Sequence, residues 1–239
     1  MSRKLLFFLG LLATMGFSWA GIIVLSQIQF GRSEAVEIKN SLTTYPTARP
    51  GLAEQGRQVY RAMGCAECHT QQVRPGSESS DMAWGWGTRR TVAQDYLYDQ
   101  PVLPGVIRLG PDLANIADRE PERFASPWQT TDPAKADMER MSWHLKHLYN
   151  PRSVAPASMM PAYRALFIER EVVLGIPASL DAIGKTSAGH EIIPTPSAKT
   201  LVAYLLSLQA DAILFETPVP SVPYGTGRNF NSLGGGGVR

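Results

Sequence analysis

The stretch Cys-Ala-Glu-Cys-His at residues 65–69 constrains this chain more than any other feature of its sequence. It is a C-x-x-C-H motif, the attachment signal of a c-type haem. Two thiols at this spacing can form thioether bonds to the vinyl groups on one edge of a porphyrin, and the adjacent histidine then becomes an axial ligand of the iron. We therefore predict one covalently bound haem c, with Cys65 and Cys68 as its thioether residues and His69 as an iron ligand.

Two other interpretations of the cysteine pair are a structural disulfide and half of a zinc site. The chain contains only 2 cysteines, and a zinc site would need two further Cys or His ligands in a matching pair. No such pair occurs at that spacing in the sequence. The complete five-residue motif favours haem, and haem predicts electron transfer.

Residues 5–26 form an apolar run of 22 residues without a charge. As a helix the run would reach about 33 Å, enough to span the hydrocarbon core of a bilayer. Arg3 and Lys4 precede it, so the positive-inside rule places the N-terminus in the cytoplasm. We predict that residues 1–30 are a cytoplasmic N-terminus and a single transmembrane anchor in the inner membrane, with the haem domain on the periplasmic side.

A cleaved signal peptide is the alternative, because residues 18–20 (Ser-Trp-Ala) form a passable cleavage site. Cleavage there would leave apolar residues 21–25 at the new terminus, and the run is longer than a normal signal core. We therefore favour the uncleaved anchor. Both interpretations export the rest of the chain, which agrees with haem attachment outside the cytoplasm.

The charge of the chain is balanced outside the anchor. Its 23 Lys and Arg exceed its 21 Asp and Glu by two, and Arg3 and Lys4 supply that excess. No basic surplus remains for a nucleic acid, so that class of partner is excluded. We expect a polar, proline-containing tether at residues 31–50, a cytochrome c domain at 51–210 with a surface insertion at 118–142, and a disordered tail at 211–239.

Hydrophobic periodicity predicts two helices that frame this domain, at residues 52–63 and 195–208. A helix before the haem and a helix that closes the domain resemble the plan of class I cytochromes c, in which the two helices cross closely. We expect Gly56 and Tyr60 to meet Tyr204 at that crossing. The alternative is a half-exposed Tyr204 with no special partner. The predicted fold is mainly α: one N-terminal transmembrane helix plus a class I cytochrome c domain with long loops.

The tetrapeptide Gly-Pro-Asp-Leu at residues 110–113 alone predicts only a turn. In class I cytochromes c a Gly-Pro of this kind lies beside the proximal histidine. The resemblance therefore implies that the backbone carbonyl of Pro111 accepts a hydrogen bond from the imidazole of His69. Such a bond fixes the ring and makes the ligand nitrogen more basic.

A haem that passes electrons also needs a second axial ligand. Met160 precedes Pro161, which favours an extended backbone at the methionine and can aim its thioether rigidly. Because His–Met is a standard pair of c-type haem ligands, we predict Met160 as the second ligand, with Met159 pointing away. The alternatives are a packed turn without iron contact, or ligation by His144, His147 or His190.

Several blocks of sequence extend beyond the haem motif, at residues 64–71, 73–75, 98–101, 110–113, 143–145, 148–152 and 160–163. Together they resemble subunit II, the monohaem O subunit, of cbb3-type cytochrome c oxidases. The methionine ligand of that family stands in a Met-Pro-Ala-Tyr block, which corresponds to Met160 here. The resemblance also makes Arg74 a candidate for a haem propionate contact, since a guanidinium can donate two hydrogen bonds to one carboxylate.

The resemblance implies a membrane complex that contains a haem-copper catalytic subunit and a dihaem cytochrome c subunit. This haem would pass electrons towards the site where oxygen is reduced to water. The chain would thus belong to an enzyme as its electron-transfer subunit, without catalytic residues of its own.

Two alternatives to the oxidase subunit stay open at this point. The monohaem subunit of a nitric oxide reductase also has an anchor and a Met-ligated haem, although the blocks at residues 143–145 and 148–152 favour the oxidase. A haem-based gas sensor would need an open position at the iron, and Met160 would fill that position.

Overall fold

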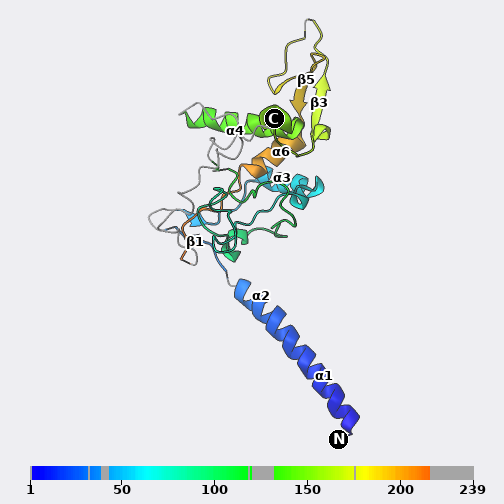
Figure 1. Cartoon of the computed structure of the whole chain (residues 1–239), viewed down its shortest axis with the longest axis vertical. Coiled ribbons are helices and arrows are strands. Elements are labelled where there is room, and N and C mark those ends of the chain that lie inside the picture. The colour runs from blue at the N-terminus through cyan, green and yellow to red at the C-terminus, as the bar shows by residue number, and fades with distance from the viewer. Residues whose placement is uncertain are drawn as a thin grey trace, which may run out of the picture. The chain divides into compact units, whose positions relative to one another are not determined.

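The computed structural model describes residues 2–31, 33–38, 43–117, 119, 132–174 and 176–215 (Figure 1). The chain forms two compact units. The first comprises Met1–Thr47 and Val92–Gln100, and the second comprises Ala48–Thr91 and Pro101–Arg239. Helices are the main regular structure, so the prediction of a mainly α chain is confirmed.

The first unit begins with the apolar helix that the sequence predicts. It consists of α1 (Arg3–Trp19), a π-helical turn (Ala20–Val24) and α2 (Leu25–Phe30). The stretch Arg3–Gln29 is long and apolar enough to cross a membrane. The hydroxyls of Thr14 and Ser26 donate to carbonyls about one turn earlier, at 2.9 and 2.6 Å, as a bilayer requires of polar groups. By length and composition, this helix has the properties of a membrane anchor.

The segment after the anchor, which we expected to be a tether, contains ordered contacts. β1 (Val36–Glu37) pairs antiparallel with β2 (Thr44–Tyr45). Tyr45 is buried, and its hydroxyl donates to Oδ1 of Asp95 at 2.7 Å. Gln94 donates from Nε2 to the carbonyl of Glu34 at 2.6 Å. Side chains from a distant 3-10 turn (Ala93–Tyr96) therefore hold this segment, and no local pattern in the sequence indicates that contact.

In the second unit, the two predicted framing helices lie side by side as α3 (Gly51–Ala62) and α6 (Pro196–Leu205) (Figure 1). A Cβ on Gly56 would collide with the carbonyl oxygen of Thr200 and would lie 2.8 Å from the Cβ of Tyr204. Tyr60 packs edge-to-face on Tyr204 with the ring centroids 5.3 Å apart, and both residues are buried. The predicted meeting of Gly56 and Tyr60 with Tyr204 is confirmed, and a half-exposed Tyr204 is wrong.

Both helices begin or end where local chemistry predicts. Gly64 follows α3 with a φ of 70°, a left-handed conformation that favours glycine at a helix C-terminus. The hydroxyl of Thr195 accepts a hydrogen bond from the amide of Ala198 at 3.3 Å, and Pro196 is the first residue of α6. Leu208 lies beyond the end of α6 and is still buried, so it packs from a loop.

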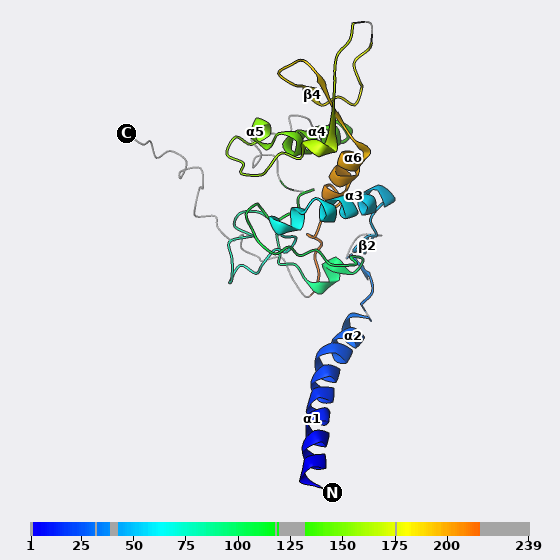
Figure 2. The ribbon, with the colours of Figure 1, turned by 90° about the vertical axis from the view of Figure 1, so that its right-hand side faces the viewer.

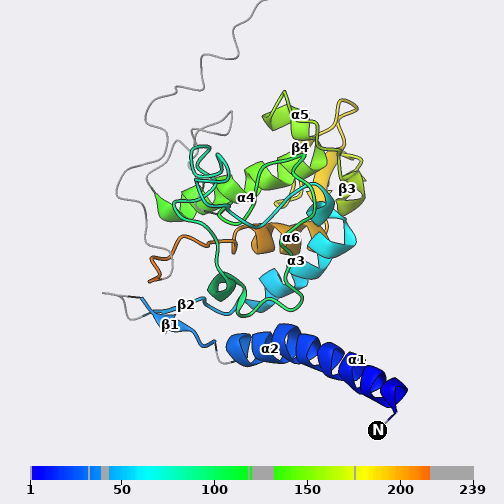
Figure 3. The ribbon, with the colours of Figure 1, turned by 60° about the horizontal axis from the view of Figure 1, so that its bottom comes forward.

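α4 (Pro133–Tyr149) contacts α6, and α5 (Pro151–Val154) follows it (Figure 3). A three-stranded antiparallel sheet has the order β3 (Phe167–Arg170), β5 (Glu191–Pro194) and β4 (Gly184–Lys185). The loops of this sheet extend beyond α4 (Figure 2). The buried carboxylate of Glu191 accepts from Arg170 at 2.6 Å and from the amide of Ser179 at 3.2 Å. We did not predict the sheet, because strands of two to four residues show too little alternation.

The expected surface insertion at residues 118–142 ends in a helix. α4 begins inside it at Pro133, and the carboxylate of Asp132 caps the helix by accepting from the amide of Ala134 at 3.0 Å. Arg119 is buried and donates a hydrogen bond to the carbonyl of Asp112. Residues 118 and 120–131 lie outside the described residues.

The packed structure continues past residue 210, where we expected the tail to begin. Arg89 donates from Nε to the carbonyl of Ala212 at 2.6 Å, and the amide of Thr88 donates to Oδ1 of Asp211 at 3.2 Å. Leu214 is 4% exposed. The contacts of the second unit therefore extend at least to residue 214, and residues 216–239 lie outside the described part of the chain.

Replacing Gly56 by alanine should destabilise the crossing of α3 and α6, because the added methyl group would meet backbone rather than a flexible side chain. We expect the detergent-solubilised full chain to lose about 2–3 kcal/mol of stability, measured as a lower melting temperature by circular dichroism. Gly51→Ala is the matched control in the same helix, since a Cβ on Gly51 meets nothing within 4 Å. Equal melting temperatures for the two variants would contradict the close crossing.

Candidate haem site

The two predicted thioether residues lie in a short 3-10 turn (Cys65–Glu67) that follows α3. Cys65 is buried, Cys68 is partly buried, and both carry free thiols. The amides of Cys68 and His69 donate to the carbonyl of Cys65 at 3.2 and 3.0 Å. The motif is therefore one compact turn that carries both thiols and the imidazole.

His69 is held by a hydrogen bond that spans 42 positions of sequence, with its Nδ1 2.8 Å from the carbonyl oxygen of Pro111. Because a carbonyl can only accept, Nδ1 carries the proton, and Nε2 of the neutral ring keeps its lone pair for a metal. Burial lowers the pKa of His69 below its ordinary value, and the hydrogen bond to Pro111 offsets this only in part. The ring is therefore held in the neutral form that can bind iron.

The chain on either side of this hydrogen bond is paired through its backbone. The amide of Gly110 donates to the carbonyl of Cys68 at 3.0 Å, and the amide of Leu113 donates to the carbonyl of Thr70 at 2.7 Å. These two bonds flank the contact between His69 and Pro111. The imidazole is thus fixed from both sides of the motif.

Two glycines allow this close approach to His69. A Cβ on Gly110 would collide with the imidazole ring, and a Cβ on Gly105 would collide with the carbonyl oxygen of His69. Gly105 also has a φ of +86°, which disfavours other residues. The resemblance to class I cytochromes c predicts the Gly-Pro pair beside the histidine, but nothing in the sequence indicates the role of Gly105.

Met160 and the cysteine turn share one apolar cluster. Met160 is partly buried and packs against a cluster of buried side chains that includes Cys65, whereas Met159 is 79% exposed. Tyr163 packs on the same cluster, and burial first and then the charges of Cys65 and Cys68 raise its pKa. The structure therefore brings the Met-Pro-Ala-Tyr segment to the cysteines, and the identity of the second iron ligand stays a prediction.

The three histidines considered as alternative ligands lie in different surroundings. His144 is buried, and burial lowers its pKa to about 3. The ring of His147 stacks on Trp143 with centroids 4.8 Å apart, and burial, with a smaller effect from the charge of His69, lowers its pKa to about 4. His190 lies in the turn between β4 and β5.

Arg74, the candidate for a propionate contact, forms an ion pair with Asp81. Nη2 of Arg74 lies 3.1 Å from Oδ1 of Asp81, and the backbone amide of Arg74 donates to Oδ2 at 2.9 Å. Nη1 of Arg108 lies 2.6 Å from Oδ2 of the same carboxylate. The side chain of Arg74 is 43% exposed, so part of the guanidinium faces solvent, and its contact with a propionate stays a prediction.

The charged network of Asp81, Arg108 and Asp112 is the part of this region that the sequence did not reveal. Both carboxylates are fully buried, and Nη2 of Arg108 lies 3.7 Å from Oδ2 of Asp112. Burial opposes ionisation of Asp81, but the hydrogen bonds from Arg74 and Arg108 outweigh it and lower the pKa of Asp81 to about 2. The spacing of four between Arg108 and Asp112 was the available signal, but it identifies pairs on helices, and these residues lie in a loop.

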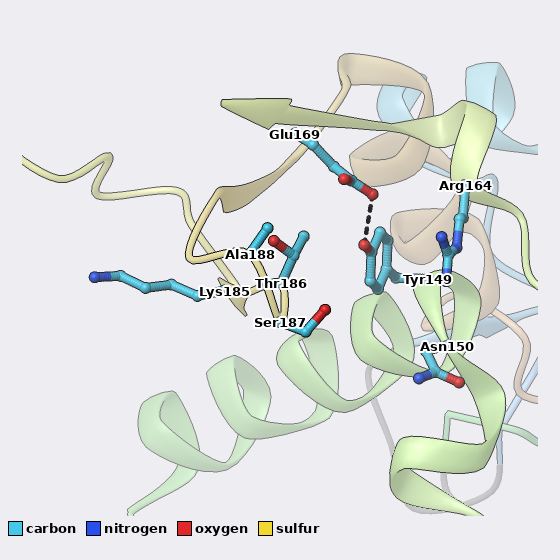
Figure 4. A pocket seen from close by; sticks show the side chains of 8 residues that line it. All are labelled: Tyr149, Asn150, Arg164, Glu169, Lys185, Thr186, Ser187 and Ala188. Carbon is cyan, nitrogen blue, oxygen red and sulfur yellow. Dashed lines mark hydrogen bonds between the residues drawn. The ribbon is translucent and has the colours of Figure 1, made fainter. Parts of the chain in front are cut away.

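A separate polar hollow of about 380 Å³ lies between the end of α4, β3 and the β4–β5 turn (Figure 4). Within it the hydroxyl of Tyr149 donates to Oε1 of Glu169 at 2.6 Å, and the guanidinium of Arg164 lies over the tyrosine ring. Neither cysteine of the motif, nor His69 or Met160, lines this hollow. It is therefore distinct from the candidate haem site.

The donor groups present near the motif suit a c-type haem. Cys65 and Cys68 supply free thiols, and His69 supplies a neutral imidazole whose Nε2 is left for iron. The thioether of Met160 packs against the same cluster as Cys65. These are the four groups that a His–Met haem c uses.

A mainly α chain with an apolar N-terminal helix and a C-x-x-C-H turn has the features of the class of membrane-anchored c-type cytochromes. The model of the family described as cytochrome C oxidase, mono-heme subunit/FixO matches residues 2–135. The match covers more than half of the chain, so the chain belongs to this family, and the resemblance to subunit II of cbb3-type oxidases is confirmed. The matched residues include the haem motif, Arg74 and Pro111 but end before Met160. No curated protein matches the chain.

Membership in this family indicates how many haems the chain holds, which kind of partner it has and where it is located. A mono-haem subunit holds one haem and is an accessory part of an enzyme complex, which implies a catalytic subunit as partner. Together with the apolar helix Arg3–Gln29, it indicates a membrane-anchored protein.

Replacing Asp81 by asparagine should remove a stabilising contribution that depends on pH. The pKa of Asp81 falls from 3.8 to about 2 on folding, so its ion pairs stabilise the protein above about pH 4 and lose that effect as pH falls towards 2. We expect the variant to be less stable by about 2 kcal/mol at pH 7, with the difference in melting temperature shrinking between pH 4 and pH 2.

The control for this pH series is Asp137→Asn, because the side chain of Asp137 is 72% exposed in its pair with Arg140 and such pairs contribute little. A difference between wild type and Asp81→Asn that stays constant from pH 7 to pH 2 would contradict the assigned ion pairs.

Proposed function

We propose that this chain is the membrane-anchored monohaem c-type cytochrome that passes electrons to the haem-copper catalytic subunit of a cbb3-type terminal oxidase. The observation that carries the proposal is the hydrogen bond from Nδ1 of His69 to Pro111. It presents Nε2 of a C-x-x-C-H histidine as a fixed, unprotonated ligand, which is what a stable c-type haem needs on its proximal side.

A haem at this site supplies a carrier that accepts and releases one electron at a time. Cys65 and Cys68 would hold its porphyrin through thioether bonds, and His69 would supply one axial ligand. Met160 would supply the second, since it packs against the cluster that contains Cys65 while its neighbour Met159 is exposed. Two fixed ligands favour electron transfer over gas binding.

The domain that holds these residues is proposed to be a class I cytochrome c domain. The close crossing of α3 and α6 supports this proposal, because class I cytochromes c pair their first and last helices in the same way. The hydrogen bond between the imidazole of His69 and the carbonyl of Pro111 supports it further. We place this domain on the periplasmic side, because Arg3 and Lys4 precede the apolar helix.

The partners proposed for the chain are the catalytic subunit and a dihaem cytochrome c subunit. The family assignment favours the oxidase over a nitric oxide reductase. Arg74 would contact a haem propionate with the part of its guanidinium that Asp81 leaves exposed.

Met160→Leu in the detergent-solubilised full chain tests this assignment. The oxidised wild type should show the weak sulfur-to-iron absorption band near the red end of the spectrum. We expect Met160→Leu to lose that band and to lower the reduction potential, because thioether ligation favours the reduced iron. Met159→Leu is the matched control and should leave both properties unchanged, since Met159 is 79% exposed.

Other outcomes of this titration would overturn the assignment. If Met160→Leu changes nothing, Met160 is not the ligand. The same spectra of His147→Leu then test His147, whose pKa is lowered by burial and, to a smaller extent, by the charge of His69. If the wild type binds carbon monoxide readily, the iron has an open position and a sensor replaces the electron carrier.

A further inference from the structure

Asp112 is a buried charge directly beside the residues that fix the proximal histidine. It follows Pro111 and is 0% exposed. Its Oδ2 accepts from the hydroxyl of Thr70 at 2.6 Å and from the amide of Gln72 at 2.7 Å, and its Oδ1 accepts from the amide of Ala114 at 2.9 Å. One carboxylate therefore ties the loop that carries Pro111 to the segment that follows His69.

These hydrogen bonds lie beside the contact between His69 and Pro111. Thr70 is the residue next to His69, and Pro111 is the residue next to Asp112. The bond from Thr70 to Asp112 therefore runs beside the bond from His69 to Pro111, whose length is 2.8 Å. Loss of the carboxylate would leave the proline carbonyl held against the imidazole by the two flanking backbone hydrogen bonds alone.

Two arginines lie beside Asp112. Nη2 of Arg108 lies 3.7 Å from its Oδ2, and the buried Arg119 donates a hydrogen bond to its backbone carbonyl. The guanidinium of Arg108 binds Asp81 more closely, with Nη1 at 2.6 Å from Oδ2, and it also donates to the carbonyl of Gln72. Arg108 is thus shared between two fully buried carboxylates, and its closer pair is with Asp81.

A buried anion acts strongly on a nearby metal, because the low dielectric of a protein interior screens it less than water does. One-electron reduction lowers the positive charge at an iron by one, so a neighbouring anion stabilises the oxidised form. A neighbouring cation has the opposite effect. Hydrogen bonding around the ligands is a further means by which a protein sets the potential of a haem.

We propose that Asp112 is a positioning residue that holds the Pro111 carbonyl against His69 and lowers the reduction potential of the haem, and that Arg108 limits this lowering. The inference rests on the proposed function, because it requires a haem whose iron is bound by His69. Asp112 acts through its hydrogen bonds to the segment after His69 and through its charge, whereas Arg108 acts through its charge.

Redox titration of the purified holoprotein, full chain in detergent, tests the proposal with dithionite and ferricyanide as reductant and oxidant. Asp112→Asn has nearly the same shape without the charge and should raise the reduction potential. Arg108→Gln removes the balancing cation and should lower it. The shifts in reduction potential must have opposite signs in the two variants. Simple loosening of the fold would expose the haem to water and would lower the potential in both.

Glu191→Gln is the matched control for the loss of a buried carboxylate. Glu191 is 1% exposed and pairs with Arg170 within the sheet at 2.6 Å. The Glu191→Gln variant should keep the reduction potential of the wild type even if its melting temperature falls. The optical spectrum should stay that of a six-coordinate haem in all three variants.

The outcomes separate this inference from the proposed function. A wild type without covalent haem would overturn both. A normal wild type with an unchanged or lowered potential in Asp112→Asn would overturn only the role of Asp112. If Asp112→Asn does not accumulate, Arg108→Gln is compared with Arg108→Lys, which keeps the cation. A potential that falls in Arg108→Gln and stays near wild type in Arg108→Lys supports the proposal, and an unchanged potential or an equal fall in both variants overturns it.

Discussion

The hydrogen bond between the imidazole of His69 and the carbonyl of Pro111 is the contact on which the rest of the site depends. It selects the tautomer, and so decides which ring nitrogen remains for a metal. It is possible only because Gly110 has no side chain, since a Cβ there would occupy the space of the ring. Backbone pairing on both sides of it and the buried carboxylate of Asp112 keep the two segments in place. A local five-residue motif thus acquires its geometry from a loop about forty residues further along the chain.

The crossing of α3 and α6 supplies the frame for this contact. α3 leads directly into the cysteine turn, and the absence of a side chain at Gly56 lets α6 approach it closely. Tyr204 of α6 then reaches the motif itself, because its buried hydroxyl donates to Oε1 of Gln71 at 3.0 Å. Gln71 lies two positions after His69. α6 is therefore joined to the segment that follows His69 by a hydrogen bond, in addition to its packing on α3.

The sequence predicted those features that depend on local pattern. The apolar helix, the two framing helices with their glycine and proline signals, and the contrast between Met159 and Met160 follow from periodicity or from neighbouring residues. Asp81 and Arg108 lie 27 positions apart and share no pattern, so their ion pair could not be foreseen. The hydrogen bond from Tyr45 to Asp95 could not be foreseen either. Nor could the strands of the small sheet, because their pairing depends on tertiary contacts. We expected the domain to end at residue 210, but Leu214 is buried. A short segment outside any helix has no periodic pattern that would reveal its packing.

The central claim is that Cys65 and Cys68 carry one haem through covalent bonds. The most direct measurement is the haem content of the purified full chain before and after extraction with acidified acetone, read as the pyridine haemochrome spectrum per mole of protein. The account predicts one haem per chain, retained in the protein after extraction, with the band position of a porphyrin whose two vinyl groups are both saturated. A haem that leaves with the solvent, or a chain that holds none, would contradict it.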